Sequence, residues 1–143
     1  MREILFRGKR KDNQWEYGNY CIAEKLDKSG VEYFIIDIDA EGSQHYVIPE
    51  TVGQYTGLED KNGKKIFEGD IVELYDKNND IRMKAYVEFG NPNREYNWGY
   101  QLVAIGEVRA DLDILLWVEM EDTGAFIEVI GNIHDNPELL KGE

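Results

Sequence analysis

Two β-rich halves of the chain are joined by Val52-Gly-Gln-Tyr-Thr-Gly-Leu-Glu-Asp-Lys-Asn-Gly-Lys-Lys-Ile-Phe-Glu-Gly-Asp-Ile-Val-Glu-Leu74. This segment holds four glycines, and its Asn62-Gly63 dipeptide favours positive φ at both central positions of a tight turn. Its last part, Phe67 to Leu74, predicts a turn that leads into a β-strand. We therefore expect residues 59–69 to form a turn-rich connector.

The segments on either side of the connector are typical of short β-strands. They are rich in β-branched and aromatic residues or alternate between apolar and polar ones, and polar turns separate them. Expected strands cover residues 3–9, 15–22, 31–38, 44–48, 71–75, 81–89, 98–105, 112–118 and 126–134. Short helical turns are expected at 23–26, at 49–52, and after Asn136, which precedes Pro137. We interpret residues 106–113 as an irregular excursion.

The fold class that follows is mainly β, with N-terminal antiparallel hairpins, a C-terminal SH3-like β-barrel and few short helices. In domain terms, residues 1–58 form an N-terminal β module, 59–69 the connector, 70–134 the barrel and 135–143 a helical turn and tail. At 143 residues, these parts fit one compact unit.

Composition is typical of a globular protein and argues against several function classes. Hydrophobic residues make up 42% of the chain, and no apolar run approaches the length of a membrane span. Cys21 is the single cysteine, so a disulfide framework is excluded and a reducing cytoplasm is the expected location. The net charge of −13 disfavours direct binding to nucleic acids, whose phosphates it would repel.

Motifs in the middle and at both ends of the chain carry a family resemblance. The middle contains Pro49-Glu-Thr-Val-Gly-Gln-Tyr-Thr-Gly-Leu58, Asp60-Lys-Asn-Gly-Lys64 and Glu68-Gly-Asp-Ile-Val72. The ends contain Met1-Arg-Glu-Ile4 with Phe6-Arg7, and Val129-Ile-Gly-Asn-Ile-His-Asp-Asn-Pro-Glu-Leu139. Together these motifs resemble the YopX family of phage and prophage proteins. The resemblance implies a largely β protein in the cytoplasm of a bacterial host, and it transfers no catalytic residue, because the family has none defined.

We assign structural roles to the residues of these motifs. Asp70 follows Gly69 at a strand entrance, where its short side chain can accept backbone N–H groups. Gly131 indicates a bulge or a close backbone contact inside a strand. The full set of expected structural residues is Gly53, Gln54, Tyr55, Gly57, Asn62, Gly63, Gly69, Asp70, Gly131 and Asn132.

No catalytic, cofactor or metal motif is recognisable in the sequence. The two histidines, His45 and His134, lie 89 positions apart (134 − 45), so no zinc-type spacing occurs. Residues 37–42 match the start of a calcium loop, but the twelfth position is Ile48 in place of glutamate. A P-loop, a nucleophile elbow and a dinucleotide fingerprint are all missing. We therefore predict no enzyme activity, no bound metal and no cofactor.

Three functions of different classes remain open. The first is an accessory module that binds a phage or host protein, or assembles with itself into a homo-oligomer, through exposed edge strands. The second is an inhibitor that imitates nucleic acid with its acidic C-terminal third. The third is an unrecognised metal-dependent hydrolase. The acidic interaction surface of the second hypothesis comprises Asp111, Asp113, Glu119, Glu121 and Asp122.

Overall fold

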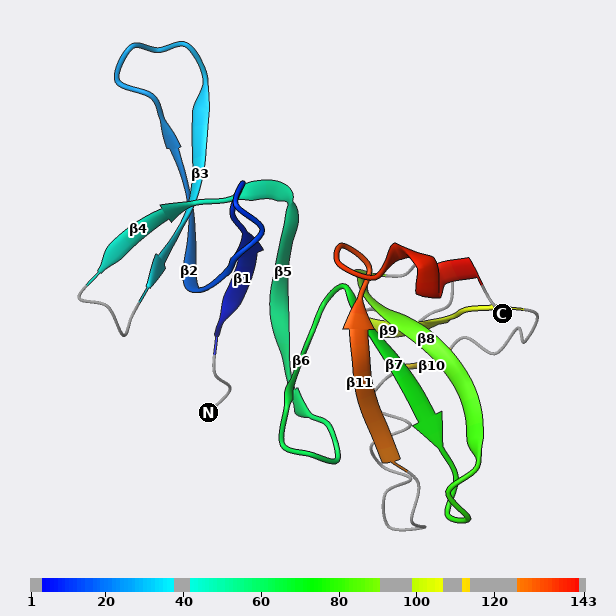
Figure 1. The fold of residues 1–143 in the computed structure, drawn as a ribbon. Coiled ribbons are helices and arrows are strands. Elements are labelled where there is room, and N and C mark those ends of the chain that lie inside the picture. The colour runs from blue at the N-terminus through cyan, green and yellow to red at the C-terminus, as the bar shows by residue number, and fades with distance from the viewer. Residues whose placement is uncertain (1–3, 38–41, 91–98, 107–111, 114–125, 142–143) are drawn as a thin grey trace. The chain divides into compact units, whose positions relative to one another are not determined.

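The computed structural model describes residues 4–37, 42–90, 99–106, 112–113 and 126–141. The chain divides into two compact units, Met1–Gly57 and Leu58–Glu143. Both units are built from antiparallel strands, so the protein is mainly β, as the sequence predicts (Figure 1). Among the described residues the one helical element is the 3₁₀ helix η2 (Pro137–Lys141), and no helix is long and apolar enough to cross a membrane.

The first unit is a sheet with the strand order β4-β3-β2-β1-β5, and β6 (Lys65–Phe67) is the next neighbour of β5. Its strands are β1 (Phe6–Lys9), β2 (Trp15–Glu24), β3 (Val31–Asp37), β4 (Ser43–Tyr46) and β5 (Ile48–Glu59). Antiparallel pairing of β1 with β2, and of β3 with β4, confirms the two hairpins expected in this half.

Strand β2 changes its partner half-way along its length. Its first half pairs with β1 and its second half with β3. The change occurs at Gly18, where a Cβ atom would lie 1.9 Å from the carbonyl oxygen of Ile36. Only glycine allows this approach, and the adjacent Ile35 is completely buried. Because β2 continues to Glu24, the helical turn expected at 23–26 is wrong.

The helical turn expected at residues 49–52 is also wrong, because these residues belong to β5. The Thr51 side chain accounts for the local irregularity that the sequence suggested. Its Oγ1 donates to the Ile48 carbonyl (2.6 Å) and accepts from the Lys9 amide (2.8 Å). The β1–β5 register shifts at this place. Pro49 has no N–H to donate, and strands tolerate proline at such irregularities.

The second unit contains a sheet with the order β10-β9-β8-β7-β11. Its strands are β7 (Asp70–Tyr75), β8 (Ile81–Gly90), β9 (Gly99–Ala104), β10 (Leu112–Asp113) and β11 (Phe126–Asn132). Within the described ranges this order is open, with β10 and β11 at its two edges, so the expected SH3-like barrel is not confirmed. Residues 114–118 of the strand expected at 112–118 lie outside the described residues.

The core of the second unit follows the predicted alternation of its strands. Along β8, Met83, Ala85 and Val87 are buried as expected, whereas Phe89 is 56% exposed and packs on the Tyr100 ring with 5.0 Å between centroids. The whole cluster consists of Ile66, Val72, Leu74, Met83, Ala85, Val87, Tyr100, Leu102 and Ile127.

The connector turns at residues 60–64, with a geometry that differs from the expected one. Gly63 has a φ of 79°, but Asn62 does not share a positive φ, so the turn has one left-handed residue in place of two. The Asp60 amide donates to the Lys64 carbonyl (2.8 Å), and the Asp60 carboxylate accepts from the amides of Asn62 (2.8 Å) and Lys64 (2.9 Å). A three-residue loop held by an aspartate therefore replaces the expected two-residue turn.

Candidate functional site

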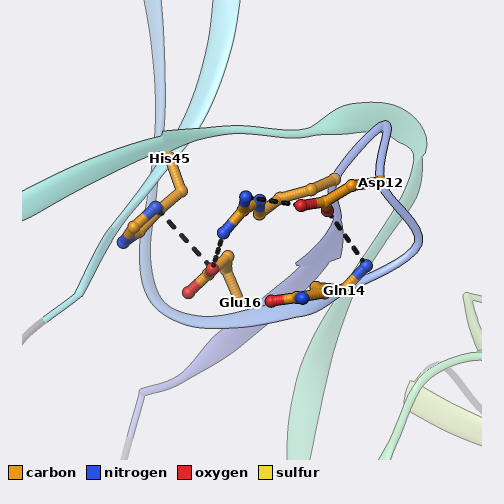
Figure 2. A network of polar contacts seen from close by, with 5 residues as sticks. Asp12, Gln14, Glu16 and His45 are labelled. Atoms are coloured by element: carbon orange, nitrogen blue, oxygen red, sulfur yellow. Dashed lines mark hydrogen bonds and ion pairs between the residues drawn. The ribbon is translucent and has the colours of Figure 1, made fainter.

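A polar network connects the β1–β2 turn of the first unit with strands β2 and β4 (Figure 2). Glu16 Oε1 accepts a hydrogen bond from Arg10 Nη1 (3.0 Å) and lies 3.6 Å from His45 Nδ1. Arg10 Nη2 also donates to Asp12 Oδ2 (2.6 Å), and Asp12 Oδ1 accepts from the backbone N–H of Gln14 (3.2 Å). The Glu16 carboxylate therefore lies between a guanidinium group and an imidazole ring.

Strand register adds Asp37 to this network. His45 is opposite Ile35 and Ser43 is opposite Asp37 in the β3–β4 pair. Directly opposed residues share a face, as do residues two apart on one strand, so Asp37 and His45 lie on the face of the buried Ile35. One ligand atom from each of Glu16, Asp37 and His45 lies within 4.8 Å of the others. Two carboxylates and an imidazole thus converge from three strands.

The electrostatics of the network depend on Arg10. The hydrogen bond to Glu16 raises the pKa of the Arg10 guanidinium, burial opposes this effect, and the negative charge of Asp12 adds to it. Arg10 is therefore a permanent positive charge beside the carboxylates. The Glu16 side chain is only 14% exposed, so its ion pair with Arg10 is partly shielded from water.

An open pocket of about 370 Å³ lies beside this network. The β1–β2 turn supplies one wall and β4 supplies the other. Its lining consists of Arg10, Lys11, Asp12, Gln44, His45 and Tyr46. These side chains offer charges of both signs, an amide, an imidazole and an aromatic ring, which are groups suited to binding a polar ligand or side chain.

Strand β4 has an open edge next to the pocket. The Val47 amide donates to the Tyr33 carbonyl (3.0 Å), and bonded and non-bonded pairs alternate along an antiparallel ladder. Gln44 and Tyr46 therefore direct their N–H and C=O groups away from β3. Both residues are exposed, Tyr46 by 61%. In the part of the chain that the structure describes, β4 is the last strand of its sheet and nothing pairs with this edge.

The outer edge of β11, in the second unit, is covered by the connector turn. The Lys61 amide donates to the Ile127 carbonyl (3.0 Å), and the Val129 amide donates to Asp60 Oδ2 (3.0 Å). These are the groups of β11 that β7 does not use. The connector therefore closes one sheet edge, which is a structural role.

The signature residues of β5 make backbone contacts with the N-terminal strand. Gly53 is opposite Arg7, Gln54 is opposite Phe6, and the Tyr55 amide donates to the Leu5 carbonyl (2.8 Å). The Tyr55 side chain is buried, and Gly57 has a φ of 88°. These contacts hold the sheet together and bring no chemical group to the pocket.

Gly69 and Asp70 organise the entrance to β7. Asp70 is 1% exposed, and its Oδ2 accepts from the Phe67 amide (2.8 Å), so it has the backbone-accepting role expected from the sequence. Gly69 has a φ of 92°; its amide donates to the Val87 carbonyl (2.8 Å) and its carbonyl accepts from the Ile133 amide (2.9 Å). This pair fixes a buried corner of the second unit.

Gly131 and Asn132 form a second structural corner. The β7–β11 register shifts just before Gly131, where a Cβ atom would lie 2.5 Å from Asn136 Oδ1. Asn132 Oδ1 accepts from the amides of His134 (3.0 Å) and Asp135 (2.9 Å). Asn136 Oδ1 accepts from the Asn132 amide (3.2 Å), so its side chain turns back to β11 and not forward onto η2 as a cap.

The predicted acidic surface is largely outside the described residues. Asp113 lies in β10, opposite Gln101. The other members, Asp111, Glu119, Glu121 and Asp122, fall in segments that the structure does not describe.

Sequence reasoning did not find the convergence of Glu16, Asp37 and His45. Glu16 lies far from Asp37 and His45 in the chain, and no local metal-ligand spacing connects the three residues. The signal that could have found it is strand register, because the expected hairpin of residues 31–38 and 44–48 already places His45 and Asp37 on one sheet.

Comparison with known proteins supports the motif resemblance. The family model for the YopX protein matches residues 5–141. The chain belongs to the YopX family. It is also similar to the crystal structure of protein EF1440 from Enterococcus faecalis, with 25% identity, a TM-score of 0.51, and coverage of 98% of this chain and 99% of that chain. No match was found among curated proteins. None of these names states an activity, so a YopX-family function has to be argued from geometry.

Proposed function

We propose that this protein is a non-enzymatic binding module that accepts an extended segment of a partner protein on strand β4. The observation that carries the proposal is the open edge of β4 beside a polar pocket. A strand with unpaired N–H and C=O groups is a template for another strand, and added strands take affinity from main-chain hydrogen bonds.

The pocket supplies the selectivity that main-chain pairing lacks. In strand addition, alternate side chains of the bound peptide enter pockets next to the edge strand. The pocket here is lined by both outward-bonding residues of β4, Gln44 and Tyr46, and by charged residues of the β1–β2 turn. A polar side chain of the partner would fit this lining better than an aliphatic one.

Charge favours a different protein over a second copy as the occupant. Each copy carries a net charge of −13, and a net charge this far from zero opposes self-association. Strand β4 itself contains no acidic or basic residue other than His45, so it does not repel a strand of either sign. The partner that we propose is neutral or basic.

The setting that we propose is the cytoplasm of a bacterium that carries a phage or prophage. The support for this setting is membership of the YopX family, whose motifs resemble those of phage and prophage proteins, and the single cysteine, which suits a reducing compartment. An accessory role in which this protein recognises a phage or host protein is consistent with both.

The decisive experiment removes the backbone N–H of Gln44, which points outward from the edge of β4. Gln44→Pro removes the N–H that a bound strand would use, and no bond to β3 is lost because that N–H points away from β3. The matched control, Gln44→Ala, removes the glutamine side chain but keeps the backbone N–H. Peptides selected from a displayed random library on the wild-type protein are expected to bind Gln44→Ala and to lose measurable binding to Gln44→Pro.

Amide NMR shifts locate the bound peptide, and they also show whether the proline variant is folded. Shifts centred on Gln44 and Tyr46 are expected. Equal binding to a folded Gln44→Pro protein, or shifts confined to the second unit, would refute the proposal. Sedimentation of the wild-type protein tests for a dimer. If a dimer forms and Gln44→Pro abolishes it, the occupant of the β4 edge is a second copy of this chain and not a different protein.

A further inference from the structure

The convergence of Glu16, Asp37 and His45 is a separate feature of the first unit. The three side chains come from the start of β2, the end of β3 and the middle of β4. Each offers one ligand atom, and the three atoms lie within 4.8 Å of one another. We propose that these residues bind a divalent transition metal ion of the Zn²⁺ type.

The distances suit one ion with little rearrangement. Oxygen and nitrogen ligands bind Zn²⁺ at about 2.0–2.2 Å, so two of them lie roughly 3.4 Å apart around a tetrahedral ion. His45 Nδ1 and Glu16 Oε1 are already 3.6 Å apart. All three residues are half-buried, and the ligand atom of Asp37 lies within 4.8 Å of the other two.

The donor set selects the class of ion. An imidazole nitrogen is a preferred ligand of Zn²⁺ and related transition metals, whereas Mg²⁺ and Ca²⁺ take oxygen ligands. Two carboxylates with one imidazole give three protein ligands. His45 also lines the open pocket, so water from the pocket can reach the remaining position on the ion.

Arg10 is the group that competes with the ion, because it donates to the Glu16 oxygen that faces His45. It has a second acceptor, Asp12 Oδ2, at 2.6 Å. When an ion binds Glu16, the Arg10 guanidinium keeps its ion pair with Asp12 and so does not lose both of its acceptors. Binding of the ion also offsets the repulsion between the Glu16 and Asp37 carboxylates.

The chain offers a matched control, because it contains two histidines, and His134 lies in the second unit. The test uses protein without a histidine tag. Co²⁺ binding is followed by visible absorption, and Zn²⁺ binding by calorimetry. Wild type and His134→Gln are expected to bind equally. The variants expected to weaken Zn²⁺ binding by more than about tenfold are His45→Gln, Glu16→Gln and Asp37→Asn, because changing even an outer-sphere partner typically costs about that much.

Amide NMR spectra without metal establish that each variant keeps the wild-type fold, so a loss of binding can be assigned to the ligand. Absence of a Co²⁺ band and of Zn²⁺ heat in the wild type would refute the site. So would equal weakening by His134→Gln, or retained affinity in the folded Glu16→Gln and Asp37→Asn variants. Stronger binding of Mg²⁺ than of Zn²⁺ would refute the class of ion. The result is independent of peptide binding at β4, which Gln44→Pro tests.

Discussion

Two turns of the second unit share one backbone design and differ in what they touch. The two turns cover residues 60–64 and 76–80. In each, the backbone N–H of the first residue donates to the carbonyl of the fifth residue, and the N–H of the fourth residue donates to the carbonyl of the first. In both turns the first residue is an aspartate, and its Oδ1 accepts from the backbone N–H groups of the third and fifth residues. Asp60 uses its second oxygen, Oδ2, on another strand, where it accepts from the Val129 backbone amide.

This difference shows what distinguishes the connector from an ordinary turn. Asp60 is buried, with 7% exposure, whereas Asp76 is half-buried; residues 61–64 and 77–80 are exposed in both turns. Lys61 extends the contact, since its Nζ lies 4.5 Å from the Phe126 ring centroid and 3.4 Å from Glu128 Oε2. The first turn therefore reverses the chain and also covers the outer edge of β11.

The largest expected effect is that of Asp60→Ala. It removes three accepted hydrogen bonds and leaves the Val129 amide without its acceptor, so the second unit is expected to lose about 3 kcal/mol of unfolding free energy. The matched change Asp76→Ala breaks the corresponding two bonds inside its turn, which contribute about 1 kcal/mol, so we expect a smaller loss than for Asp60→Ala. Hydrogen exchange of β7 amides measures both values. Equal losses would mean that the contact with Val129 contributes nothing.

A smaller effect is expected at the fourth position of each turn, where φ is positive in both. A Cβ atom at Gly63 (φ 79°) would meet only Glu59 Oε2, at an ordinary contact distance of 4.0 Å, so Gly63→Ala meets chiefly the backbone penalty of the left-handed conformation, about 1 kcal/mol. Asn79 (φ 66°) already carries a Cβ atom, and Asn79→Ala should cost less than about 0.5 kcal/mol. Urea denaturation of the two variants checks this order. A larger loss for Asn79→Ala would show that the turns differ in backbone and not only in contacts.

The smallest effect is a change of stability with pH that is confined to alkaline pH. It concerns Tyr75, which precedes the second turn and whose ring centroid lies 5.3 Å from Lys61 Nζ of the first. The hydrogen bond that its hydroxyl donates to Glu73 (2.9 Å) is the main cause that raises the pKa of Tyr75 from 10.0 to about 12. Because the folded-state value is the higher one, the stabilisation is complete below pH 10 and is lost as the pH rises through 12.

Tyr75→Phe should therefore flatten the decline of stability in this alkaline range and leave the slope near neutral pH unchanged. Unfolding of wild type and variant across the range, together with tyrosinate absorbance, provides the measurement. An unchanged alkaline slope in the variant would assign the decline to other groups.

Local pairings of the fold were predictable because hairpin partners are close in sequence. The alternation of residues 81–89 and the aromatic pattern around Trp15 lead directly to β8 and to the β1–β2 hairpin. Strand β5 was harder, because Pro49, Gly53 and Gly57 have the composition of a loop. The side chain of Thr51 makes the bonds that keep this segment in the sheet, and such a bond leaves no periodic pattern.

The candidate sites depend on register between strands, which one sequence does not specify. His45 and Asp37 were noticed as single residues, but their approach to Glu16 requires the β2–β3 pairing to be known. Asp60 has an ordinary turn composition, and its bond to Val129 spans 69 positions. Closure of the barrel is not confirmed for the same reason: β11 pairs with β7, but strand count and spacing do not determine whether the two outer strands of the sheet, β10 and β11, meet.

Gly18 has a consequence for how mutational data on this family should be interpreted. The carbonyl of Ile36 occupies the place of any side chain at this position, so every replacement must push β3 away from β2. In a saturation mutagenesis experiment Gly18 would tolerate nothing and would rank with catalytic residues, although it contributes no functional group. Intolerance at this position reports the distance between two backbones.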